Sequence, residues 1–174
     1  NHRIDMIQSG FENWSYGPSR FKLPPSKFRV FRIKKFEWID HPADIGFRAY
    51  GKSLADAFEN AALALTNIIG VTDNIDEKEE VLIELEAEDV EALLYEWLDH
   101  LIYLQGARRI VGGRFEVKEL SKVKGGYELK AKLWGEEYDP AKHGPGTEVK
   151  AMTYHMMEIN QEPERCSVQV VVDI

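Results

Sequence analysis

The chain contains a single cysteine, Cys166, among its 174 residues. One cysteine can form neither an intrachain disulfide framework nor a zinc cluster built from several thiolates. No stretch approaches the roughly 20 consecutive apolar residues that a helix needs to cross a bilayer. The beginning of the sequence also lacks the basic region, apolar segment and small-residue cleavage site of a secretory signal. We therefore expect a cytoplasmic protein that does not associate with membranes.

Signatures of familiar enzyme classes are also missing. The sequence has no G-x-x-x-x-G-K-[ST] phosphate loop, no G-x-S-x-G elbow and no H-E-x-x-H zinc motif. Its five histidines show no spacing typical of metal ligands. Isolated Ser, His and Asp residues are too common to indicate a catalytic triad. None of these enzyme classes is predicted.

The charge is distributed unevenly along the chain. The formal net charge is −8, yet residues 1–35 carry eight Lys or Arg against Asp5 and Glu12, a net of +6. The remaining residues therefore carry −14. Because an acidic surface repels phosphate backbones, this larger part is a poor candidate for binding nucleic acid by itself. It suits cations or basic protein partners.

Length and composition favour one compact domain preceded by a leader. With 44% hydrophobic residues, 174 residues can bury one sizeable core. Residues 1–30 mix Gly, Pro, Ser and scattered aromatics without periodicity, and Pro24-Pro25 disfavours regular structure. We interpret them as a poorly ordered leader before a domain at residues 31–174. An alternative is that its basic and aromatic residues stack on single-stranded RNA.

The hydrophobic pattern predicts an α+β fold. Apolar residues recur at helical spacing over 53–70 and 89–106, where Gly70 and Gly106 are suitable ends. Alternating or β-rich segments predict strands at 28–38, 47–50, 81–88, 108–111, 114–120, 127–134, 147–159 and 167–174, with a loop at 135–146. Two helices against largely antiparallel sheet are expected, with a sheet on each side of the helices as one arrangement.

The segment 40–46, with the sequence DHPADIG, could form a cation site at the end of a strand. Pro42 fixes the turn and Gly46 permits close backbone approach, so that Asp40, Asp44 and carbonyl groups could face a hard cation. Manganese could also gain a ligand in His41. The alternative is that the two aspartates only accept hydrogen bonds from backbone groups in the turn.

Two further segments carry candidate site residues. The sequence ends in a valine-rich strand followed directly by Asp173 and Ile174. If that strand lies in the sheet, their oxygens occupy a fixed place; the alternative is an edge strand with a solvated end. Lys150 lies on a strand that follows a Gly-rich loop, and is either a solvated sheet residue or a cation held near an acidic site.

These segments together resemble the archease family. The resemblance rests on the segment 36–46, the helix at 53–70, the T-E-V-K-A strand within 146–154 and the final V-D-I, and it spans about residue 33 to Ile174. It implies a metal-binding accessory protein, not an enzyme, for the GTP-dependent RNA ligase that joins ends bearing a 3′-phosphate in tRNA splicing. In that role it promotes guanylylation of the ligase and multiple turnover.

The resemblance also implies which residues act. The essential acids fall on Asp44 and Asp173, a metal-site main-chain oxygen or carboxylate on Ile174, and the important lysine on Lys150. Calcium is the first choice of metal, with manganese or magnesium as alternatives. One departure is Pro42, where the family usually has Thr. Two rival functions stay open: a metal-dependent phosphohydrolase using Asp44 and Asp173, and an RNA-binding chaperone using the leader.

Overall fold

The computed structural model describes residues 34–39, 44–70 and 74–174, all of which belong to one compact unit, Ile33–Ile174. The predicted leader at residues 1–30 lies outside the described residues. The elements are β1 (Phe36–Ile39), β2 (Ile45–Gly51), α1 (Leu54–Ile69), β3 (Glu79–Ala87), α2 (Val90–Arg108), β4 (Ile110–Val123), β5 (Gly126–Glu137), α3 (Pro140–His143), β6 (Ala151–Met152), β7 (Glu158–Glu162) and β8 (Arg165–Asp173).

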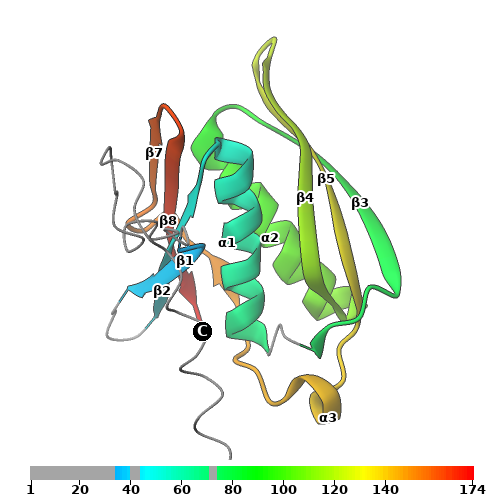
Figure 1. Ribbon diagram of the computed structural model, residues 1–174. Helices are drawn as coiled ribbons and strands as arrows, with labels where there is room; N and C mark the ends of the chain where they lie inside the picture. The colour runs from blue at the N-terminus through cyan, green and yellow to red at the C-terminus, as the bar shows by residue number, and fades with distance from the viewer. Residues whose placement is uncertain (1–33, 40–43, 71–73) are drawn as a thin grey trace, which may run out of the picture. The chain divides into compact units, whose positions relative to one another are not determined.

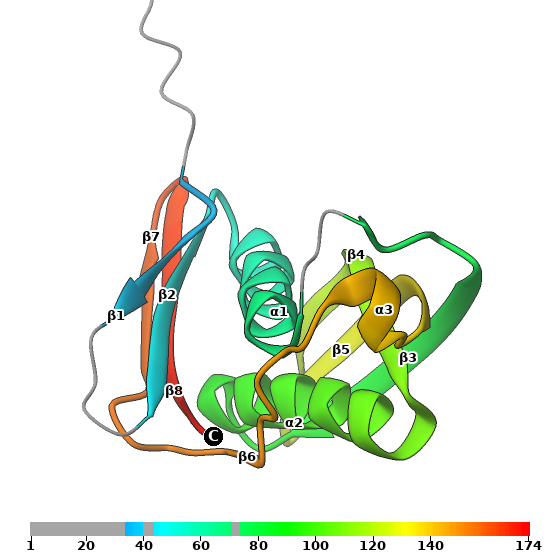
Figure 2. The ribbon, with the colours of Figure 1, turned by 90° about the horizontal axis from the view of Figure 1, so that it is seen from below.

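The strands form two antiparallel sheets with the two long helices between them (Figures 1 and 2). Sheet A has the order β1-β2-β8-β6, with β7 also paired to β8, and sheet B has the order β3-β5-β4. Helix α1 packs on β2 and β8 of sheet A and on β4 of sheet B, and α2 packs on all three strands of sheet B. The α+β class and the sheet on each side of the helices are confirmed.

Helix α1 is suited to this central position by its alanines. Ser53 caps its first turn by accepting a hydrogen bond from the Asp56 backbone N–H, as its sequence predicts. Four alanines of the helix are fully buried, which lets both sheets approach closely (Ala57, Ala61, Ala62 and Ala64). Gly70 caps the other end. The predicted extent of this helix is confirmed.

Helix α2 supplies the largest fully buried side chain of the core, that of Trp97. Asp89 caps it by accepting from the Ala92 backbone N–H. Trp97 is fully buried, and its indole N–H donates to the Phe58 carbonyl at 3.0 Å, which ties α2 to α1. The predicted end at Gly106 is wrong, because α2 runs to Arg108. Arg109 makes the cap instead, in the left-handed conformation (φ 56°), with its N–H bonded to the Leu104 carbonyl.

The predicted strand at 147–159 is also wrong in its extent. Only Ala151–Met152 and Glu158–Glu162 are strands, both paired to β8. Between them Thr153 donates its hydroxyl to the Val171 carbonyl at 2.8 Å, and Met156 has a φ of 55°. Tyr154 stacks on Tyr95 of α2, with ring centroids 4.6 Å apart. The chain therefore leaves the sheet edge to contact the helix.

Sheet B differs from the prediction in two details. The two strands predicted at 108–111 and 114–120 are one strand, β4, which begins at Ile110 after the end of α2 and whose register shifts at Gly112–Arg114 and Val117–Glu119 mark β-bulges. The expected loop at 135–146 contains the end of β5 and the short helix α3. The predicted acidic outer face of β3 is confirmed, because Leu82, Glu84 and Glu86 are exposed while Ile83 is buried. Within the described residues, no helix is long and apolar enough to cross a membrane.

Candidate functional site

The central strand β8 brings the candidate residues of three segments to one end of sheet A. Ile45 of β2 pairs with Val172, and Ala151 of β6 pairs with Asp173 on the other side of β8. Asp44 directly precedes Ile45, the first residue of β2, and Asp173 directly follows Val172 in β8, so both aspartates lie at the same end of the β2–β8 pair. The fold thus brings two acidic residues that are far apart in sequence to one end of sheet A.

The face on which Asp173 lies follows from the alternation along β8. Val168, Val170 and Val172 belong to the hydrophobic core between the sheets. Asp173 therefore points to the outer face of sheet A. Gln169 occupies that same face and accepts a hydrogen bond from the Arg48 guanidinium at 2.5 Å. Asp173 therefore lies at the end of a sheet face on which Gln169, nearer the middle of β8, is hydrogen-bonded to Arg48.

Lys150 is tied to the end of β8 by both its backbone and its side chain. Its N–H donates to the Asp173 carbonyl at 2.9 Å, and its ammonium donates to the Ile174 carbonyl, also at 2.9 Å. Lys150 and Asp173 are exposed, whereas Asp44 and Ile174 are half-buried. Lys150 is thus both exposed and in contact with the main chain of Asp173 and Ile174, and its role near an acidic site stays a prediction.

The donor set at this end of the sheet consists of oxygens. Two carboxylates and the main-chain oxygen of Ile174 are ligands of the kind that calcium, magnesium and manganese accept. In the part of the chain that the structure describes, no three His, Cys, Asp or Glu side chains come together as a ready-made metal site. Asp40, His41 and Pro42 lie outside the described residues. The chemistry of these oxygens suits a hard cation, whose remaining ligands would come from water or a partner, and the Ile174 carbonyl already accepts a hydrogen bond from the Lys150 ammonium.

The matching family model covers nearly all of the described residues. The Archease protein family (MTH1598/TM1083) matches residues 36–174. The chain belongs to the archease family. The segment before residue 36 is outside this match.

Related archeases come from several archaea. Protein archease of Pyrococcus abyssi is 46% identical over 143 residues, which are 82% of this chain and 100% of that protein. Protein archease of Methanosarcina mazei is 41% identical over 141 residues, 81% of this chain and 97% of that protein. The solution structure of Methanobacterium thermoautotrophicum protein 1598 is similar at a TM-score of 0.69 and 36% identity, covering 80% of this chain and 99% of that one.

A second polar cluster of this archease was missed by the sequence reasoning. Glu136 at the end of β5 and His143 in α3 are 3% and 1% exposed and contact each other at 3.1 Å. Glu136 and His143 are seven residues apart within the segment 135–146, for which the sequence predicts a loop. Neither charge nor periodicity in that segment indicates burial. The sequence offered only one indication of the cluster, a Gly-rich, charged segment directly after the strand predicted at 127–134.

Proposed function

We propose that this archease is a metal-binding protein activator of the GTP-dependent RNA ligase that joins 3′-phosphate ends in tRNA splicing. In this role it acts on the ligase and not as an enzyme on RNA, promoting ligase guanylylation and repeated turnover. Its place of action is the cytoplasm. Membership of the archease family supports the proposal, together with the acidic character of the chain after residue 35, which suits a basic protein partner.

The observation that carries the proposal is that Asp44, Asp173, Ile174 and Lys150 lie at one end of sheet A. Two carboxylates held close together would repel each other unless a cation lay between them. Asp44, Asp173 and the main-chain oxygen of Ile174 would hold the metal, with calcium preferred over manganese or magnesium. The bound cation would neutralise the acid pair. Lys150 would then face phosphate groups in the nucleotide-loaded site of the ligase.

A ligase turnover assay tests the proposal. RNA with a 3′-phosphate and a 5′-hydroxyl end is joined by the ligase in the presence of GTP, with and without this archease. We expect more turnovers per ligase with the protein present, and loss of the stimulation for Asp44→Asn, which keeps the shape of the side chain and removes its charge. An Asn variant that stimulates like the parent would contradict the electrostatic role of Asp44.

Two rival functions give different results in parallel assays of the archease alone. Metal-dependent hydrolysis of phosphoesters without ligase would favour a phosphohydrolase that uses Asp44 and Asp173. RNA binding that weakens with salt and disappears on deleting residues 1–30 would favour an RNA-binding chaperone. We expect neither activity.

A further inference from the structure

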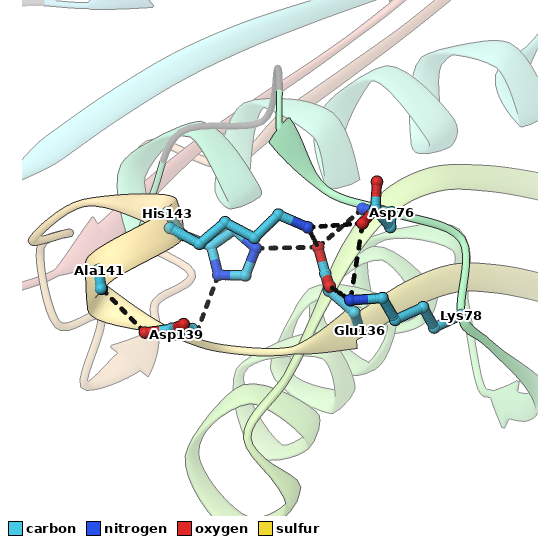
Figure 3. A network of polar contacts seen from close by, with 7 residues as sticks. Asp76, Lys78, Glu136, Asp139, Ala141 and His143 are labelled. Atoms are coloured by element: carbon cyan, nitrogen blue, oxygen red, sulfur yellow. Dashed lines mark hydrogen bonds and ion pairs between the residues drawn. The ribbon is translucent and has the colours of Figure 1, made fainter.

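The segment between β5 and β6 ends at Lys150 and begins in a polar network around the buried side chains of Glu136 and His143 (Figure 3). The Glu136 carboxylate accepts hydrogen bonds from the Asp76 backbone N–H at 2.8 Å and the Lys78 ammonium at 2.5 Å, and it also binds the Lys142 ammonium. These contacts, those of Lys142 first, hold the pKa of Glu136 well below its usual range. A charged carboxylate therefore sits beneath the segment at neutral pH.

His143 connects this carboxylate to the turn that starts α3. The ring nitrogen Nδ1 accepts a hydrogen bond from the Asp139 backbone N–H at 2.9 Å. A nitrogen that accepts cannot carry a proton, so the proton is on Nε2, which donates to Glu136 at 3.1 Å. Both ring nitrogens are thus used, and α3 is fixed to the end of β5.

Tyr138 extends the attachment from α3 toward Lys150. Its ring stacks against His143 at 5.7 Å between centroids. Its hydroxyl donates to the Gly144 carbonyl at 2.6 Å and accepts from the Gly146 N–H at 3.3 Å. One phenolic oxygen therefore holds two backbone groups of the glycine-rich loop.

The next residues of the loop lie directly on the end of α1. The Thr147 N–H donates to the Ile68 carbonyl at 3.0 Å. A Cβ atom added to Gly146 would lie 1.3 Å from the Ile69 carbonyl oxygen, so only glycine allows this approach. Val149 is 4% exposed, and Lys150 then reaches Asp173 and Ile174. The segment from Glu136 to Lys150 is therefore held at several points along its length.

We infer that Tyr138 is a positioning residue for Lys150, with its hydroxyl setting the glycine-rich loop and the Glu136–His143 pair setting Tyr138. The importance of Lys150 to ligase stimulation comes from the proposed function, on which the activity part of this inference rests. The structural part does not depend on the ligase. Without the hydroxyl, the loop can still adopt the same conformation, but Lys150 occupies its position beside Asp173 and Ile174 for a smaller fraction of the time.

The conservative variant Tyr138→Phe removes only the oxygen atom. Hydrogen–deuterium exchange of the Thr147 and Lys150 backbone N–H groups measures the loop directly, without ligase. We expect both to exchange about three- to tenfold faster, the change typical of losing one hydrogen bond. Tyr103→Phe, which removes a hydroxyl from an exposed residue of α2, is the matched control and should leave both unchanged.

In the ligase assay, Tyr138→Phe should raise the archease concentration for half-maximal stimulation by a similar factor and leave the maximum unchanged. Docking selects the molecules in which Lys150 is placed, so the cost is in apparent affinity. The double variant Tyr138→Phe with Lys150→Ala should be no worse than Lys150→Ala alone, because Tyr138 acts through Lys150. Circular dichroism checks that the variants remain folded.

Different results would refute the proposed function and the positioning role of Tyr138. Normal stimulation by Lys150→Ala would refute the role of Lys150 and with it the activity part of the inference. Impaired Lys150→Ala together with unchanged amide exchange and half-maximal concentration in Tyr138→Phe would overturn the positioning role and leave the proposed function standing. Additive losses in the double variant would also overturn it, since Tyr138 would then act independently of Lys150.

Discussion

Replacing Asp173 by Asn should change the stability of the domain in opposite directions with and without metal. In the metal-free domain, Asp44, which precedes β2, and Asp173, in β8, are like charges at the same end of sheet A. At about 5 Å, the spacing that a continuation of the β2–β8 register by one pair would give them, their repulsion is worth about 0.8 kcal/mol in water and about 3 kcal/mol at an effective dielectric constant of 20. Asp173 is exposed, so we expect Asp173→Asn to stabilise the domain in EDTA by about 1 kcal/mol, nearer the lower value. That corresponds to a rise of about 3 °C in the melting temperature.

With calcium the sign reverses. A ligand at about 100 times its Kd stabilises the folded state by about 2.7 kcal/mol. If losing one charged ligand raises the Kd for calcium about 100-fold, the same calcium concentration stabilises the folded state of the variant by only about 0.4 kcal/mol. The parent should therefore be the more stable of the two in calcium, by about 1 kcal/mol after the relief of repulsion is included.

The assay is thermal or urea unfolding of both proteins in EDTA, calcium, magnesium and manganese. Glu86→Gln is the matched control, because Glu86 is opposed to Glu128 across β3 and β5, far from the site in the register. It should gain modest stability under every condition and show no dependence on metal. If Asp173→Asn is less stable than the parent in EDTA, or if calcium stabilises both proteins equally, the acid pair is not a metal site.

Three other perturbations follow from the structure. Lys150→Ala should impair ligase stimulation, and Lys150→Arg should restore it only partly if a compact ammonium is needed near phosphate. Full activity of Lys150→Ala in the turnover assay would mean that Lys150 is only a solvated residue directly before β6. Gly146→Ala should destabilise the domain by about 2 kcal/mol or more in urea unfolding, because the added Cβ would overlap the Ile69 carbonyl and displace the loop from the end of α1. A change in the free energy of unfolding below about 0.5 kcal/mol, typical of surface substitutions, would contradict that packing. Because its pKa is depressed, Glu136 binds fewer protons in the folded state than in the unfolded state near pH 4. The ionised carboxylate therefore stabilises the domain above about pH 4.3, and this contribution is lost as the pH falls toward the folded pKa. In urea unfolding across that range, the free energy of unfolding should fall less with acid for Glu136→Gln than for the parent, and equal falls would argue against the depressed pKa.

The sequence was sufficient to predict the elements whose signals are local. Ser53 and Gly70 delimit α1 because capping and glycine conformations depend on a few adjacent residues. Alternation along β3 predicted its exposed acidic face for the same reason. The end of α2 was missed because Gly106 is accommodated inside the helix, while an arginine adopts the left-handed cap at 109. Propensity alone does not distinguish these two endings.

The sequence proposed the members of the candidate site and not their surroundings. Asp44, Asp173, Ile174 and Lys150 were proposed from their segments and from the family resemblance, and the fold brings their segments to one end of sheet A. Their binding of metal stays a prediction. The supporting network of Glu136, His143 and Tyr138 depends on burial created by elements far apart in sequence, and no local pattern indicates it.

The position of β8 in sheet A also determines when the site can exist during synthesis. β8 is the last strand of the domain to leave the ribosome, yet it lies in the interior of the sheet, between β2 on one side and β6 and β7 on the other. Until it emerges, β2 lacks one of its two neighbours, and β6 and β7 have no strand to pair with. Sheet B and both long helices are complete in the nascent chain well before that moment. A chain that ends before β8 would thus keep only the β1–β2 pair of sheet A, would lack Asp173, and would expose apolar residues that β8 covers in the complete domain.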